Sequence, residues 1–219
     1  MRLATIAAAL AVLGATCVLS LSCVSIGEGS GSVVSDHLIA KDCWDGPFDL
    51  EPDFFSADPF RNTVEIRMQR GSDLLEVSDG VVILVDDIEA VRGMLGEDIP
   101  VTLPLGVAPP GIAEGTLCGE DACSSPVHVA LYLLDSCHAQ NLVLYGTGGT
   151  VRFDELFSGD PNEKDAAEKL TVGQFDVVVG DPRDIVREGR NLGDLPNTSA
   201  ISGRFRFYFQ RGQPAQPFP

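Results

Sequence analysis

The feature of this 219-residue chain that most limits its fold is a series of short apolar runs separated by turn-forming residues. The clearest run, residues 62–69, alternates apolar and polar side chains with the period of a half-buried β-strand. Similar runs lie at 73–77, 81–85, 127–134, 141–145, 150–153, 171–179 and 203–209. This spacing predicts an all-β domain of about eight strands. We expect an antiparallel β-sandwich, with a closed β-barrel as the alternative.

Only one or two short helical turns are predicted between these runs. Asp87 precedes apolar residues at helical spacing, which predicts a helical turn that ends near Gly96. Gly-Asp-Pro occurs twice, and it predicts a short helix over 161–169 and a single turn after Pro182 because Asp caps and Pro starts helices. The glycines of 146–149 predict a hairpin connection between two strands.

The final run, 203–209, has the sharpest alternation in the chain. Its three phenylalanines share one face, which we assign to the core, while Arg204 and Arg206 share the other face. We favour pairing of these arginines with carboxylates such as Asp176 or Glu65, because acidic residues outnumber basic ones. The alternative is that Arg204 and Arg206 contact an anionic ligand.

The N-terminal residues 1–22 have the features of an export signal. Arg2 is followed by an apolar run and by small residues directly before Cys23. This segment resembles the type II signal of bacterial lipoproteins, and the resemblance implies that Cys23 is acylated as the first mature residue. The residue three positions before Cys23 is Ser20, where that family usually has leucine. An ordinary signal-peptide cut and an uncut membrane anchor therefore remain as alternatives.

Composition after the signal suggests three further segments. We expect a lipid-anchored flexible linker over 23–36, a single β domain over 37–209 and a Pro/Gln-rich tail over 210–219. The resemblance implies attachment to the lipid bilayer of the cell envelope. It also implies the outer membrane, at its periplasmic or surface face, because no Asp follows Cys23.

The cysteines fit an exported protein. Loss of Cys17 with the signal and acylation of Cys23 would leave an even set of four: Cys43, Cys118, Cys123 and Cys137. An even number in an oxidising compartment predicts two disulfides. We favour the pairs Cys118–Cys123 and Cys43–Cys137, although two other connectivities remain open. A zinc site at Cys118, Cys123 and Cys137 with His138 is disfavoured by the spacing, so we expect no metal.

Charge and motifs limit the function. The net charge of −17 disfavours nucleic-acid binding, because phosphate backbones would be repelled. The sequence has no nucleophile elbow, P-loop or metalloprotease motif. We therefore expect no cofactor and no catalysis, but a binding or structural domain with an envelope protein or glycan as partner.

Two further functions remain open. The first is a carbohydrate-binding or carbohydrate-processing module, for which Trp44, the only tryptophan, would be the aromatic contact. Packing beside a disulfide is the other interpretation of Trp44. The second function is hydrolysis, which would need His128 or His138 close to an acid.

Overall fold

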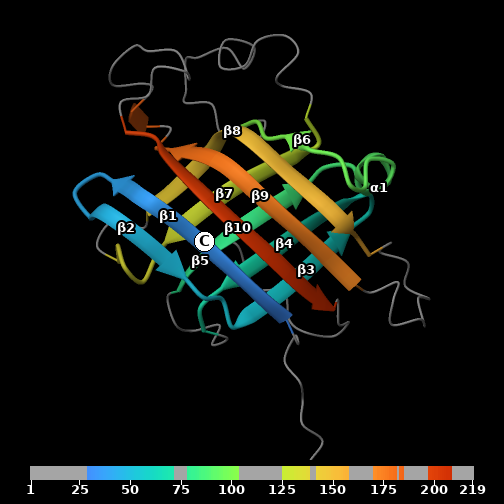
Figure 1. Ribbon diagram of the computed structural model, residues 1–219, viewed down its shortest axis with the longest axis horizontal. Coiled ribbons are helices and arrows are strands. Elements are labelled where there is room, and N and C mark those ends of the chain that lie inside the picture. The colour runs from blue at the N-terminus through green and yellow to red at the C-terminus, as the bar shows by residue number, and fades with distance from the viewer. Residues whose placement is uncertain are drawn as a thin grey trace, which may run out of the picture.

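The fold is known from a computed structural model, which describes residues 29–71, 78–103, 125–138, 142–157, 170–181, 183–184 and 197–208. These residues form ten strands and one short helix (Figure 1). The elements are β1 (Gly29–Ala40), β2 (Trp44–Leu50), β3 (Phe54–Phe60), β4 (Thr63–Gln69), β5 (Asp79–Val85), α1 (Ile88–Arg92), β6 (Ile99–Pro100), β7 (Val127–Leu133), β8 (Leu142–Glu155), β9 (Leu170–Gly180) and β10 (Ser199–Tyr208). Every pair of neighbouring strands is antiparallel.

The strands form one curled sheet in the order β2-β1-β10-β9-β8-β7-β5-β4-β3, with β6 paired to β8. Figure 1 shows β1, β10 and β9 crossing in front of β3, β4 and β5. The two layers are in contact, because the rings of Phe55 on β3 and Phe207 on β10 stack with centroids 5.9 Å apart. Among the described strands, β2 and β3 are edges that do not pair with each other. The predicted all-β antiparallel fold is confirmed, and its two sandwich layers belong to one open sheet.

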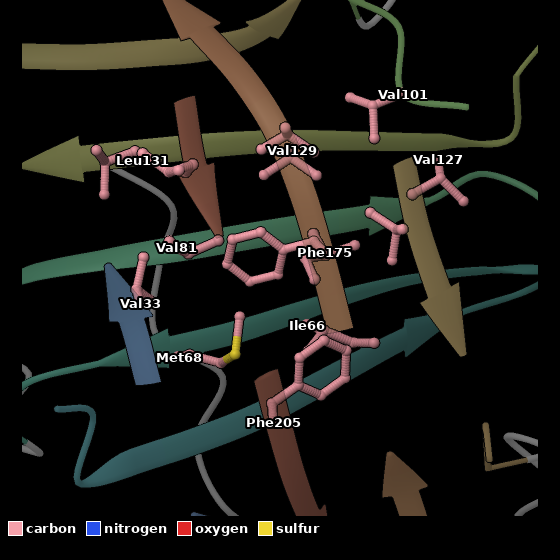
Figure 2. Close-up of a cluster of buried hydrophobic side chains, with 14 of the residues drawn as sticks. Val33, Ile66, Met68, Val81, Val101, Val127, Val129, Leu131, Phe175 and Phe205 are labelled. Carbon is pink, nitrogen blue, oxygen red and sulfur yellow. The ribbon is translucent and has the colours of Figure 1, made fainter. Parts of the chain in front are cut away.

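The core between the layers depends on rows in which phenylalanine alternates with glycine. One cross-strand row reads Gly31, Phe205, Gly173 and Phe153 across β1, β10, β9 and β8. The next row reads Val33, Gly203, Phe175 and Val151 across the same strands. Figure 2 shows Phe175 and Phe205 among aliphatic side chains of the other layer. The Phe205 ring covers Gly173 and the Phe175 ring covers Gly203, so large and small residues fill the space between the layers together.

Several element predictions are confirmed and two are wrong. The strands predicted at 62–69, 81–85, 127–134, 171–179 and 203–209 correspond to β4, β5, β7, β9 and β10. Residues 29–36, predicted as part of the linker, instead belong to β1 and pair with β10 from Gly29↔Phe207 onward. The predicted hairpin at 146–149 lies inside the continuous strand β8, and β2 and β3 were not predicted. The predictions at 73–77, 161–169 and 210–219 lie outside the described residues.

The glycines of β8 allow the strand to bend within the sheet and do not form a turn. The register with β9 shifts by one residue between Gly146 and Gly148, which is a β-bulge. Gly149 has φ +93°, and a Cβ atom there would lie 2.6 Å from the Cα of Val177 on β9. Only glycine can combine this backbone angle with so close an approach. The strand therefore bends and continues where a hairpin was predicted.

Helix α1 begins as predicted but is shorter. The Asp87 carboxylate accepts hydrogen bonds from the Ala90 N–H at 2.9 Å and from the Asn62 amide at 2.8 Å. These bonds, the Ala90 bond most of all, hold the pKa of Asp87 below its usual value because they favour the charged carboxylate. The helix ends at Gly93 rather than near Gly96.

The buried hydroxyl of Thr171 leads to a prediction about the stability of the fold. The Thr171 side chain on β9 is fully buried opposite Phe207, and its hydroxyl has no hydrogen-bond partner in the described part of the chain. Thr171→Val should raise the free energy of unfolding by about 1 kcal/mol, because an unsatisfied buried hydroxyl is costly. Urea unfolding monitored by circular dichroism measures this change.

Thr63→Val is the matched control, because the Thr63 hydroxyl donates to the Phe60 carbonyl at 2.7 Å. This second variant should be less stable than the wild type. A destabilised Thr171→Val variant would contradict the prediction.

Candidate functional site

The outer side of β1, β10, β9 and β8 carries a regular array of polar side chains. Its central cross-strand row is Ser32, Arg204, Gln174 and Arg152. One flanking row is Val34, Ser202, Asp176 and Thr150, and the other contains Ser30, Arg206 and Val172. We call these three rows the Arg204 face. Directly opposed side chains of this kind have Cβ atoms about 5 Å apart, so they can act on one ligand.

Two adjoining hollows lie on the Arg204 face. Their volumes are about 350 and 380 Å³, and Arg204 and Gln174 line both of them. Asp98, which directly precedes β6, adds a carboxylate to the first hollow, and Asp154 adds one to the second. The hollows arise where short serine and threonine side chains lie between longer arginine and glutamine side chains. Their volumes lie at the lower end of the range typical of small-molecule sites.

The arginines of this face differ in their contacts. Arg152 is paired with Asp154 at 3.1 Å. Arg206 donates to the Tyr208 hydroxyl at 3.0 Å and lies 5.1 Å from the centre of that ring. Among the described residues, neither Arg204 nor Arg206 forms an ion pair with a carboxylate, and both are exposed. Arg204 is therefore accessible to a ligand.

The predicted carboxylate partners of these arginines were wrong. Glu65 lies in the other layer, where it pairs with Arg67 at 2.7 Å. Asp176 is on β9, but it lies directly opposite Ser202 rather than Arg204. Sequence alternation placed Arg204 and Arg206 on one face correctly. The cross-strand register, which decides their neighbours, could not be read from one strand alone.

The Trp44 ring is part of the packing around a disulfide. Cys43 and Cys137 are joined as predicted, with a Cα–Cα distance of 5.7 Å. The neighbouring Trp44 is half-buried against the core, its ring meets Phe48 edge-on at 5.6 Å, and its Nε1–H donates to the Pro47 carbonyl at 3.3 Å. This geometry fits the packing interpretation better than an exposed aromatic contact. Cys23, Cys118 and Cys123 lie outside the described residues.

His128 lies close to an acid but is fully engaged. The ring is buried on β7; its Nδ1 lies 2.6 Å from the Thr102 carbonyl oxygen and its Nε2 lies 3.1 Å from the Asp86 carboxylate. Both ring nitrogens therefore have a polar partner within the protein itself. His138 is exposed on the turn after β7, with Nδ1 3.2 Å from the Asp135 carbonyl. This geometry gives His128 a cross-linking role between strands.

A second polar cluster, on the outer side of β4 and β7, was missed by sequence reasoning. Arg67 and Gln69 are only 3% and 1% exposed, although alternation predicted that this side of β4 faces away from the core. The Tyr132 hydroxyl donates to the Gln69 side-chain oxygen at 2.9 Å. Burial raises the pKa of Tyr132, so the phenol remains a neutral donor. The cluster therefore acts as a hydrogen-bonded support for the sheet.

Metal-binding groups and membrane-spanning helices are both absent from the described residues. No set of three or more His, Cys, Asp or Glu side chains in the described ranges is arranged to hold a metal ion. The same residues contain no helix long and apolar enough to cross a bilayer.

Comparison with known proteins gives no assignment. No family model, curated protein or solved structure matches this chain.

Proposed function

We propose that the protein is a lipid-anchored domain of the bacterial cell envelope that binds a ligand or partner and does not catalyse a reaction. The Cys43–Cys137 disulfide is the observation that most supports the location. Disulfides of this structural kind form and persist in exported proteins and are rare in the cytosol. The export signal before Cys23 is consistent with the same compartment.

The Arg204 face supports binding rather than catalysis. It presents guanidinium, amide, hydroxyl and carboxylate groups on rigid strands, a suitable arrangement for holding a ligand by hydrogen bonds. A nucleophile within reach of a base would be needed for acyl transfer, and the described residues of this face include no histidine or cysteine. Trp44 does not offer an exposed ring, so a carbohydrate ligand would have to bind elsewhere on the domain.

The proposed lipid anchor predicts the intact mass of the mature protein. The protein purified from bacterial membranes should have the intact mass of residues 23–219 with a diacylglyceryl group and a further acyl group. Cys23→Ala should abolish this modification and move the protein out of the membrane fraction, because lipid chains would supply the attachment. Separation of inner and outer membranes would then locate the wild-type protein.

Cys17→Ala is the matched control, because it removes a thiol from the same segment without affecting the residue that receives lipid. Its mature mass and membrane attachment should equal those of the wild type. A wild-type protein without lipid, recovered in the soluble fraction, would refute the anchor.

A further inference from the structure

We infer that the Arg204 face binds an extended glycan chain, with Arg204 and Gln174 as the central contacts. The inference names the ligand class for the proposed binding function and therefore rests on it. It starts from the accessible guanidinium of Arg204, which lies directly between Ser32 on β1 and Gln174 on β9. Both hollows of the face meet at Arg204 and Gln174.

The hydrogen-bonding groups of the face indicate a ligand with many hydroxyl groups. Arginine only donates, an ionised carboxylate only accepts, and an amide does both. A simple anion would be attracted by Arg204 but repelled by Asp98 and Asp176, which line the same hollow. A simple cation would meet the opposite problem. A sugar hydroxyl donates and accepts, so consecutive sugar units can satisfy both kinds of group.

The shape of the face indicates a chain rather than a small, enclosed molecule. The two hollows adjoin through shared residues, and together they follow the sheet from Asp98 to Arg206. Sites for small ligands usually bury most of the ligand surface, whereas these hollows lie on one side of a sheet. An extended oligosaccharide could occupy both hollows at once.

The face is rigid before any ligand arrives. Arg204 lies between Gly203 and Phe205, and the Phe205 ring is buried in the glycine–phenylalanine rows beneath it. Gln174 lies in the same way between Gly173 and Phe175. Little ordering of the backbone is required on binding, which favours affinity from a modest number of hydrogen bonds.

The proposed anchor would place this face near the bilayer. The strand β1 begins at Gly29, six positions after Cys23, and an extended chain of that length spans at most about 20 Å. Ser30, which lines the second hollow, is the next residue. Glycan chains at the envelope surface would therefore lie within reach of the face.

Calorimetric titration of the full mature protein in detergent tests the inference. The probes are the neutral hexasaccharides cellohexaose and chitohexaose, with inorganic phosphate as the competing anion. At least one hexasaccharide should bind, and Arg204→Ala and Gln174→Ala should each weaken its binding roughly tenfold or more. Arg70→Ala is the matched control, because Arg70 is exposed beside β4 in the other layer. The Arg70→Ala protein should bind the hexasaccharide with the affinity of the wild type.

Each other outcome would overturn the inference. Failure of both hexasaccharides to bind would do so, as would binding that Arg204→Ala leaves unchanged. Displacement of the sugar by millimolar phosphate would identify a simple anion site instead. The anchor is tested separately, because the Cys23→Ala protein should bind the same hexasaccharide with unchanged affinity even if lipidation proves wrong.

Discussion

Replacing Gly203 by alanine should lower the free energy of unfolding by about 3 kcal/mol, one of the two largest changes we expect from this structure. A Cβ atom at this position would overlap the Phe175 ring and would lie 2.6 Å from the Ser32 carbonyl oxygen. The ring and the neighbouring strand would both have to move, because Phe175 is buried in the core. Thermal unfolding should show a midpoint lower by roughly 6 to 12 °C.

Gly148→Ala is the control for this experiment. A Cβ atom at Gly148 on β8 would meet no other atom within 4 Å. The control should change stability by about 0.5 kcal/mol or less, because the added methyl group would meet open space and Gly148, although part of the β-bulge, does not have a positive φ. Equal midpoints for the Gly203→Ala and Gly148→Ala proteins would show that the glycine–phenylalanine rows do not need glycine.

Removal of the Cys43–Cys137 disulfide should cost about 4 kcal/mol, because the bond joins residues 94 positions apart and restricts the unfolded chain strongly. Cys43 lies in the turn between β1 and β2, while Cys137 is buried in the turn after β7. The double variant Cys43→Ala/Cys137→Ala tests this by urea unfolding without reductant.

Reductant supplies the internal control. Added to the wild type, it should reduce stability toward that of the double variant, whereas the double variant itself should lose much less. A double variant as stable as the oxidised wild type would mean that this bond does not support the fold.

The parts of the fold that were predictable are those determined within one strand. Residues 62–69 and 203–209 alternate clearly, and the strands described there, β4 and β10 as far as Tyr208, have the expected inward faces. Residues 29–36 were assigned to a linker because their Gly/Ser composition is typical of flexible segments. Gly29 and Gly31 are instead suited to strand β1 because the Phe55 ring of β3 packs against both of them, so that a Cβ atom at Gly29 would overlap this ring and one at Gly31 would lie 3.1 Å from it. That reason involves residues far away in sequence, so no local pattern reveals it.

In the candidate site, too, the features determined within one strand were predictable, while those that depend on the pairing of strands were not. The exposed side of β10 was predicted from alternation, so Arg204 and Arg206 were found as candidates. Gln174 became a central residue only through the register that places it opposite both Arg204 and Arg152. Trp44, the only tryptophan, was a candidate for ligand contact, but it packs beside the Cys43–Cys137 disulfide. Burial of Arg67 likewise depends on tertiary packing that strand periodicity does not describe.

The position of β10 beside β1 delays the completion of the sheet during synthesis. The first strand is held between β2 and the last strand, and the Ser35 hydroxyl donates to the Ala200 carbonyl across 165 residues of sequence. β1 therefore lacks its inner partner until nearly the whole chain has emerged, and loop closure over such a distance slows folding. If the chain is exported as we propose, this delay would keep it unfolded, and therefore able to pass through a narrow secretion channel, until translocation ends.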